Sequence, residues 1–348
     1  MKWWLKIVCV LLLFYSAFSA FWHPMSPGGL SVSASTFHPG RNDFQLKGYG
    51  THFQSESASL QVLVGCDSAA VYKAEILQVV DESNVIASLF LPDTISSGKF
   101  IFIANNNVDG SVIIESPIGS EGFTFVDGSK NPDYRYEVKQ EDFQGFGYPF
   151  QPIIIETIRN LMWHVPMWFT MFFLMILSVI FSVRALGKDN GLVNYTFDAK
   201  ASATAGTGLL FCILGLVTGS VWARFTWGAW WTNDPQLNGA MVVFIVYAAY
   251  FILRKSTPDE DKRARLSAIF NIFAFALMVV LLMVMPRFTE GLHPGKSGNP
   301  AFSKYDLDSS LRMVFYPAVA GFILLGYWMY NLNYRISKLE IHEEESHV

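Results

Sequence analysis

The chain has 348 residues, of which 51% are hydrophobic and only 16% are charged, and its formal net charge is -4 at pH 7. Such an apolar composition is typical of a membrane protein rather than an ordinary soluble one. The lack of a basic excess argues against nucleic acid as a partner, because phosphate backbones are bound by clustered Lys and Arg. We therefore expect membrane lipids around the chain and no bound nucleic acid.

The N-terminal segment, residues 1–21, begins with two lysines and continues with an apolar run over 7–20. This run is short compared with the about 20 residues needed to cross a bilayer. The segment is either a transmembrane anchor or a signal peptide, since the small residues Ala17 and Ser19 have the spacing that a signal peptidase accepts. Both interpretations export the residues that follow.

The next part of the chain is acidic and predicted to be rich in strands. Between residues 22 and 157 there are 16 acidic side chains and 7 basic ones, and no apolar run is long enough to span a membrane. Short β-branched or aromatic runs separated by Gly, Asn, Asp or Pro are typical of strands. We predict an extracytoplasmic β-rich soluble domain over 22–151, as a small sandwich or barrel. The predicted strands are 60–64, 71–80, 85–91, 100–103 and 111–114.

Residues 152–335 contain the remaining membrane domain. With the N-terminal segment, its apolar runs predict an α-helical polytopic membrane protein of about six transmembrane helices, carrying the β-rich domain as an insertion. Basic residues gather in the links 184–200 and 254–265, and Arg335 and Lys338 lie at the start of the tail, so the positive-inside rule makes the two links and the tail 336–348 cytoplasmic. The tail is acidic and too short to fold alone. The five apolar runs are 163–183, 203–221, 240–253, 266–285 and 314–332.

Three features that could form a binding site fall on the opposite, extracytoplasmic side. They are a histidine at the outer end of the second span, a tryptophan-rich loop, and a histidine after the fifth span. Haem is a flat, largely apolar macrocycle with two anionic propionates and an iron that accepts imidazole from either face. Aromatic planes, two histidines and a cation meet those needs. The candidates are His164 and His293 as ligands, Trp227, Trp230, Trp231 and Asp234 as the cradle, and Arg224 and Arg287 as propionate partners.

Each candidate also has an ordinary explanation. A tryptophan at a span end often belongs to the interfacial belt, and a single histidine there is often solvated. The two arginines are equally suited to lipid phosphates. Two histidines on one side of the membrane, flanking a loop with three tryptophans, favour a site over these separate explanations. His23, His38 and His52 lie in the soluble part and are assigned no role.

In these residues the chain resembles the tryptophan-rich haem-handling membrane proteins, and among them the CcmC-type family of bacterial cytochrome c maturation. The resemblance covers about 158–335. It implies six spans, His164 and His293 as axial ligands of the iron, and a b-type haem held non-covalently and transiently. It also implies a periplasmic haem chaperone and ABC-type transporter subunits as partners, in the bacterial inner membrane. The matching blocks are MWHVP at 162–166, LVTGSVW at 216–222, WGAWW at 227–231 and LHPG at 292–295.

The chain departs from the family pattern in two places. Asn233 and Gln236 stand where the family usually has Trp and Arg, so one aromatic ring and one cation are missing, and Arg224 or Arg287 is expected to carry more of the propionate pairing. The domain over 22–151 is absent from typical short members. We interpret it as a docking module for the chaperone or the apocytochrome, because exposed strand edges accept partner strands.

The leading functional hypothesis is a binding protein that presents or transfers haem, rather than a catalyst. One alternative is a cytochrome c synthetase of the related CcsA type, but those proteins usually have histidines within the membrane, and this chain has none at mid-span. Another is a haem transporter subunit. Transporters usually carry ionisable residues at mid-bilayer, whereas the spans here are nearly free of charge.

Overall fold

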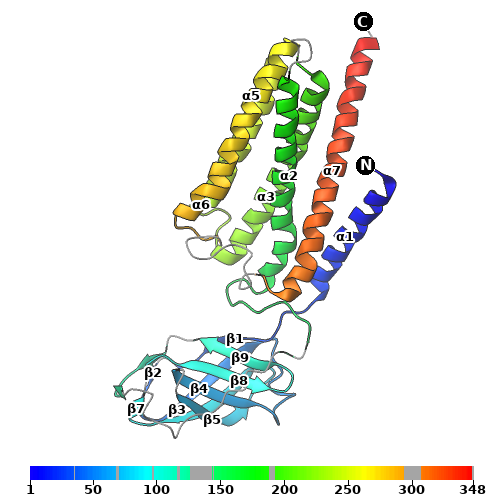
Figure 1. Cartoon of the computed structure of the whole chain (residues 1–348). Helices are drawn as coiled ribbons and strands as arrows, with labels where there is room; N and C mark the ends of the chain where they lie inside the picture. The colour runs from blue at the N-terminus through cyan, green and yellow to red at the C-terminus, as the bar shows by residue number, and fades with distance from the viewer. Residues whose placement is uncertain are drawn as a thin grey trace. The chain divides into compact units, whose positions relative to one another are not determined.

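The computed structural model describes residues 1–34, 36–67, 70–95, 98–115, 118–125, 143, 145–187, 193–293 and 307–346. It divides into two compact units, one formed by Met1–Trp22 with Thr157–Val348 and the other by His23–Glu156. The first unit is helical and the second is built from strands (Figure 1). The predicted fold class, a polytopic helical membrane protein with an inserted β-rich part, is confirmed.

Among the described residues, six helical segments are long and apolar enough to cross a membrane. All five spans expected after residue 152 are present, and the N-terminal segment forms a helix of 20 residues. The segments are α1 (Trp3–Trp22), α2 (Leu161–Leu186) with the preceding 3-10 turn η3 (Glu156–Asn160), α3 (Tyr195–Trp227), α4 (Pro235–Ser256), α5 (Glu260–Val279) continued by the π-helical η4 (Val280–Val284) and α6 (Met285–Phe288), and α7 (Ser309–Ser346).

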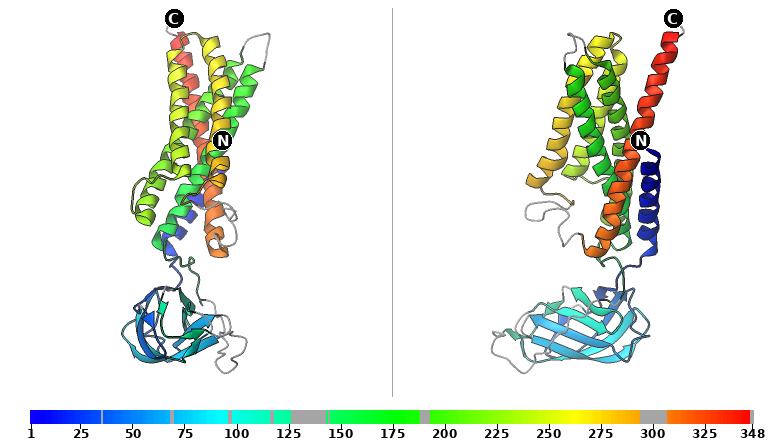
Figure 2. Two further views of the ribbon diagram at one scale, coloured as in Figure 1. Left: turned by 90° about the vertical axis from the view of Figure 1, so that its left-hand side faces the viewer. Right: turned by 45° about the vertical axis from the view of Figure 1, so that its right-hand side comes forward.

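Successive spans alternate in direction, so α2, α4 and α7 begin at the end of the helical unit where α1, α3 and α6 finish (Figures 1 and 2). We call this the histidine end, because His164 and His293 both lie there. The opposite, basic end carries Arg184, Lys200 and Arg254. The chain leaves α1 for the strand unit, and returns to α2, at the histidine end.

Local sequence explains where the helices near the histidine end stop and start. Gly228, with φ of +79°, closes α3 in the left-handed conformation that favours glycine. Asp234 caps α4 by accepting the backbone N–H groups of its first turn, and Pro235 occupies the first helical position. The turn between α3 and α4, which holds the tryptophan signature, is thus fixed at both ends.

Polar side chains hold the helices together inside the unit. Asn271 of α5 donates to the hydroxyls of Ser178 (2.7 Å) and Ser182 (2.9 Å) on α2. At the basic end, Arg254 forms a two-pronged ion pair with Asp198, at 2.7 and 2.8 Å. Such contacts join helices where no hydrophobic driving force operates between them.

In the strand unit, seven strands form one antiparallel sheet in the order β1-β3-β6-β5-β4-β8-β9. Its outer strands also meet: a Cβ on Gly29 of β1 would lie 2.7 Å from the carbonyl oxygen of Ile113 in β9, so glycine is required and the sheet curls until its edges touch. The strands are β1 (Gly28–Val32), β3 (Gly40–Tyr49), β4 (Gln61–Asp67), β5 (Ala70–Val79), β6 (Asn84–Leu91), β8 (Ile101–Asn106) and β9 (Gly110–Glu115), with two short pairs, β2 (Thr36–Phe37) with β10 (Gly119–Ser120) and β7 (Thr94–Ile95) with β11 (Thr124–Phe125).

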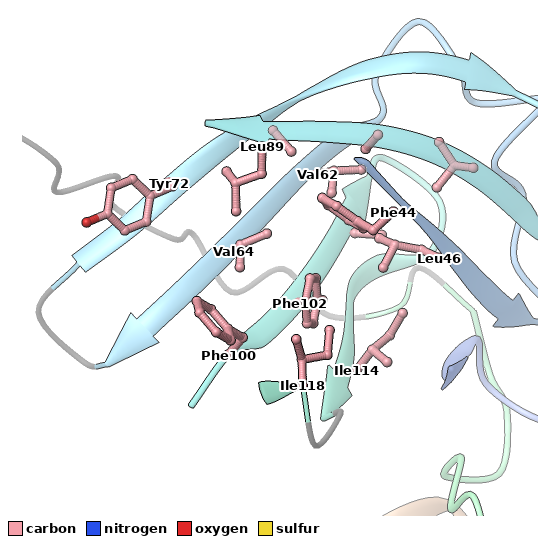
Figure 3. Close-up of a cluster of buried hydrophobic side chains, with 14 of the residues drawn as sticks. Phe44, Leu46, Val62, Val64, Tyr72, Leu89, Phe100, Phe102, Ile114 and Ile118 are labelled. Carbon is pink, nitrogen blue, oxygen red and sulfur yellow. The ribbon is translucent and has the colours of Figure 1, made fainter. Parts of the chain in front are cut away.

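Alternate residues of these strands fill the interior of the curled sheet (Figure 3). Phe102 is fully buried and meets Phe44 edge to face, with ring centroids 5.3 Å apart. Val62 and Val64 of the neighbouring strand point into the same core. This interior of aromatic and β-branched side chains gives the unit a core of its own.

The structure confirms the five predicted strands and corrects two expectations. It adds β1 and β3, whose few apolar residues, such as Phe44 and Leu46, are separated by polar ones. It also extends α7 to Ser346, whereas the tail was expected not to fold. A helix that already exists is extended at low cost, because propagation avoids the unfavourable nucleation step.

Candidate functional site

His164 lies in the first turn of α2 with its imidazole directed to α3. Its Nδ1 lies 3.1 Å from the Thr218 hydroxyl. The Thr218 hydroxyl has one proton, which it donates to the Leu214 carbonyl at 2.8 Å. The hydroxyl therefore acts as an acceptor toward Nδ1, so Nδ1 carries the ring proton. The lone pair of the neutral imidazole is then on Nε2, where a metal can take it.

A glycine makes the space that this imidazole occupies. A Cβ on Gly219 would lie 2.6 Å from Cε1 of His164, closer than carbon atoms pack. Trp222 and Trp168 present their edges to the same ring, at centroid distances of 5.7 and 6.2 Å. The imidazole is thus held in a slot between α2 and α3, and its direction is set by packing as well as by hydrogen bonds.

His293 follows α6 and is held by Asp234 at the start of α4. Its Nδ1 lies 2.9 Å from Oδ1 of Asp234, and the imidazole meets the ring of Trp227 edge to face at 5.0 Å. The carboxylate is only 2% exposed and also accepts the backbone N–H of Leu292 at 2.6 Å. Because a carboxylate only accepts, Nδ1 of His293 is protonated and Nε2 is again the free ligand atom.

The surroundings of Asp234 keep it ionised. Burial opposes its negative charge, but the hydrogen bonds from His293 and from the N–H of Leu292 outweigh burial and hold the pKa of Asp234 well below its usual value. Gly291 allows this close approach, since a Cβ there would lie 2.6 Å from Oδ2 of Asp234. A histidine that donates its second nitrogen to a carboxylate is the usual arrangement behind a metal ligand.

The two predicted ligands both lie at the histidine end of the helical unit. Within the described part of the chain, no three His, Cys, Asp or Glu side chains gather as a bare metal ion would require. Two imidazoles instead fit an iron that brings four nitrogen ligands of its own, as haem iron does.

The tryptophan-rich turn exposes aromatic surface beside this pair. Trp230 is 58% exposed and Trp231 38%. Trp231 donates its indole N–H to Asn238 at 3.2 Å, and the Asn238 amide donates to Asn233 at 2.8 Å. Asn233, which stands where the family has a tryptophan, thus takes part in fixing the orientation of Trp231.

The two candidate cations lie at the histidine end, but each is tied to its own segment. The Arg224 guanidinium donates to the Gly228 carbonyl. Nε of Arg287 donates to the Met283 carbonyl at 3.2 Å. In the described ranges, neither arginine contacts a carboxylate or either histidine. Each guanidinium has five N–H donors, so most of them are left for another acceptor.

A small open hollow adjoins His293. Pro294 and Gly295 of the matched family block lie outside the described residues. The hollow is lined by Asp234, Pro235, Gln236, Pro286, Thr289, Gly291 and His293.

Sequence reasoning named the ligands but missed the residues that orient them. Thr218 and Gly219 lay within a matched block without a role, and Gly291 was assigned none. A glycine next to a polar residue inside an apolar span was the available signal, because it permits close approach between helices. Asp234 was assigned to the cradle, and the structure places it behind His293.

Comparison with known proteins relates the helical unit to one family. The family described as cytochrome C assembly protein matches residues 149–293. Heme exporter protein C of Paracoccus denitrificans is 25% identical over 176 residues, which are 49% of this chain and 68% of the relative. The corresponding protein of Rhodobacter capsulatus is 25% identical over 162 residues, 44% of this chain and 62% of the relative.

A second kind of relative matches a shorter stretch. Cytochrome c biogenesis protein CcsA of Prochlorococcus marinus (strain MIT 9303) is 35% identical over 96 residues, which are 28% of this chain but only 29% of the relative. The chain thus spans about two thirds of the two heme exporter relatives and less than a third of this CcsA protein. The family resemblance that the sequence motifs indicated is confirmed.

Proposed function

We propose that the helical unit, which is similar to the cytochrome C assembly family over residues 149–293, binds haem at the histidine end and presents it to an acceptor protein during cytochrome c maturation. The observation that carries the proposal is the pair of imidazoles. His164 and His293 both keep Nε2 free, and each is fixed from behind, by Thr218 and by Asp234. Two such nitrogens are what haem iron takes as axial ligands.

The exposed tryptophans give the macrocycle a surface to lie on. Apolar contact contributes about 25 cal/mol per Å² removed from water, and the exposed parts of Trp230 and Trp231 are available for it. Arg224 and Arg287 have guanidinium donors left over for the propionates. A haem held on an open surface stays accessible to an acceptor, so we infer non-covalent, transient binding.

The distribution of charge supports an extracytoplasmic site. Basic residues cluster at the end opposite the histidines, so the positive-inside rule puts the histidine end outside the cytoplasm of a bacterial inner membrane. We further propose ABC-type transporter subunits as neighbours, which the heme exporter relatives suggest, and a periplasmic haem chaperone as acceptor. The acidic strand unit, with its own core, is then a docking module for the chaperone or the apocytochrome.

The experiment is to purify the protein in detergent, load it with haem b and record optical spectra. We expect a low-spin bis-imidazole spectrum that is lost in both His164→Ala and His293→Ala. His52→Ala is the matched control. His52 is also held by a carboxylate, Asp109, at 2.7 Å, but it belongs to the strand unit and is expected to leave the spectrum unchanged.

A wild-type protein that binds no haem contradicts the proposal, as does a native spectrum in both target variants. A changed spectrum in His52→Ala would indicate that the strand unit contributes an iron ligand. The CcsA-type alternative predicts a different product. Incubation with haem and a CxxCH peptide then gives covalently attached haem, which survives denaturation, whereas a presenting protein releases all of its haem.

A further inference from the structure

The two imidazoles differ in what stands behind them. The Nδ1 proton of His293 points to a buried, ionised carboxylate, that of Asp234. The Nδ1 proton of His164 points to a neutral acceptor, the Thr218 hydroxyl, and the Gly215 carbonyl, which is also neutral, is the other hydrogen-bond partner of the ring. Position is fixed in both cases, but only His293 has a full negative charge on its far side.

That charge affects how strongly each nitrogen binds iron. A hydrogen bond from Nδ1–H to a carboxylate gives the ring part of an imidazolate's character and raises the basicity of Nε2. Charge-assisted hydrogen bonds are also about twice as strong as neutral ones. The neutral partners of His164 polarise its ring much less, so equal ligation by the two histidines is not expected.

The charge also discriminates between oxidation states of a haem bound between neutral imidazoles. The iron-porphyrin core is neutral with Fe(II) and carries one positive charge with Fe(III), apart from the propionates. Asp234, which is 2% exposed, lies close behind one ligand. Its negative charge balances the positive charge of the Fe(III) core, whereas beside the neutral Fe(II) core the same buried charge has nothing to balance it. Both effects favour the oxidised iron.

Resting on the proposed haem function, we propose that Asp234 is a positioning and tuning residue that acts through His293. It makes His293 the stronger of the two iron ligands and lowers the reduction potential of the bound haem. Thr218 orients His164 without this effect. The reaction is a one-electron reduction, in which Fe(III) takes an electron from the titrating reductant and becomes Fe(II). Both histidines keep their Nδ1 protons during this step.

The test is a reductive titration of the haem-loaded protein, with Asp234→Asn compared to Thr218→Val. Asparagine also caps helices and its amide oxygen accepts a hydrogen bond, so this variant removes the charge with little change of shape. At the wild-type midpoint potential we expect the Fe(II) to Fe(III) ratio to rise about tenfold in Asp234→Asn, a shift of about 59 mV for one electron. Thr218→Val is expected to shift the midpoint potential far less.

A second readout isolates His293. In ferrous His164→Ala, where His293 is the remaining ligand, the iron-histidine stretching frequency in resonance Raman spectra reports the hydrogen bond at Nδ1. We expect it to fall when Asp234→Asn is added. If Asp234→Asn does not retain haem, Asp234→Ser supplies a neutral capping residue and Asp234→Glu restores the charge, with a potential near that of the wild type.

The inference is overturned if Asp234→Asn leaves the potential unchanged, or if Thr218→Val shifts it equally. Either result leaves the proposed function intact, because the wild-type protein still shows its bis-imidazole spectrum. A wild-type protein without bound haem overturns the proposed function and this inference together. The two failures are therefore distinguishable in one set of preparations.

Discussion

Replacing Gly219 with alanine tests the slot that holds His164. The new Cβ would lie 2.6 Å from Cε1 of the imidazole, whereas carbon atoms pack at about 3.5–4.0 Å. The ring must therefore retreat by about 1 Å, and overpacking of this kind costs about 1–3 kcal/mol. Since about 1.4 kcal/mol is a factor of ten, we expect Nε2 ligation by His164 to weaken about 5- to 150-fold.

The assay is the optical spectrum of the haem-loaded Gly219→Ala variant, which we expect to resemble that of His164→Ala. Gly206→Ala is the matched control, because it lies in the same helix and its Cβ would meet its nearest neighbours at 3.5 Å, an ordinary contact. Alanine there adds helix propensity of about 0.8–1.0 kcal/mol and is expected to leave the spectrum native. A native low-spin spectrum in Gly219→Ala would refute the claim that glycine is needed at this position to make room for His164.

Three further predictions concern the strand unit. Burial raises the pKa of the Cys66 thiol to about 12, so we expect no maleimide labelling of Cys66 at pH 8 until denaturant is added; rapid labelling of the native protein contradicts this. Phe102→Ala should destabilise the unit by about 3–5 kcal/mol in denaturant titrations, while Phe90→Ala, at a side chain 74% exposed, should change little; equal losses disprove the core assignment. Hydrogen bonds from the Ser55 hydroxyl and backbone N–H hold the pKa of Glu82 below its ordinary value, so its stabilising effect is present above that ordinary pKa and is lost as pH falls. Glu82→Gln should therefore be less stable than the wild type at pH 7, with the gap closing in acid; a gap independent of pH argues against it.

The membrane fold was predictable because span length and charge asymmetry are one-dimensional signals. Long apolar runs predict helices whatever surrounds them, and all six predicted segments are present among the described residues. The strand unit was harder to predict, because β3 carries Phe44 and Leu46 among polar residues. Its identity as a strand becomes clear only from the strands with which it pairs. Pairing between distant strands cannot be read from a single run of residues.

In the site, too, some residues could be predicted from the sequence and others could not. Residue types predicted His164 and His293, because imidazole has a distinctive chemistry and both lie at one end of the spans. The residues behind them could not be predicted from type, because Thr218 is 54 positions from His164 and Asp234 is 59 from His293. Their roles follow from helix packing and from a turn that brings separate segments within hydrogen-bonding distance.

The most direct test of the central claim is electron paramagnetic resonance, with near-infrared magnetic circular dichroism, on the ferric haem-loaded protein. The account predicts a low-spin species with two nitrogen ligands of imidazole type. In the His164→Ala and His293→Ala double variant this signal should be absent, while in His52→Ala it should be intact. A wild-type spectrum with one imidazole or none, or a bis-imidazole signal that survives in the double variant, would contradict it.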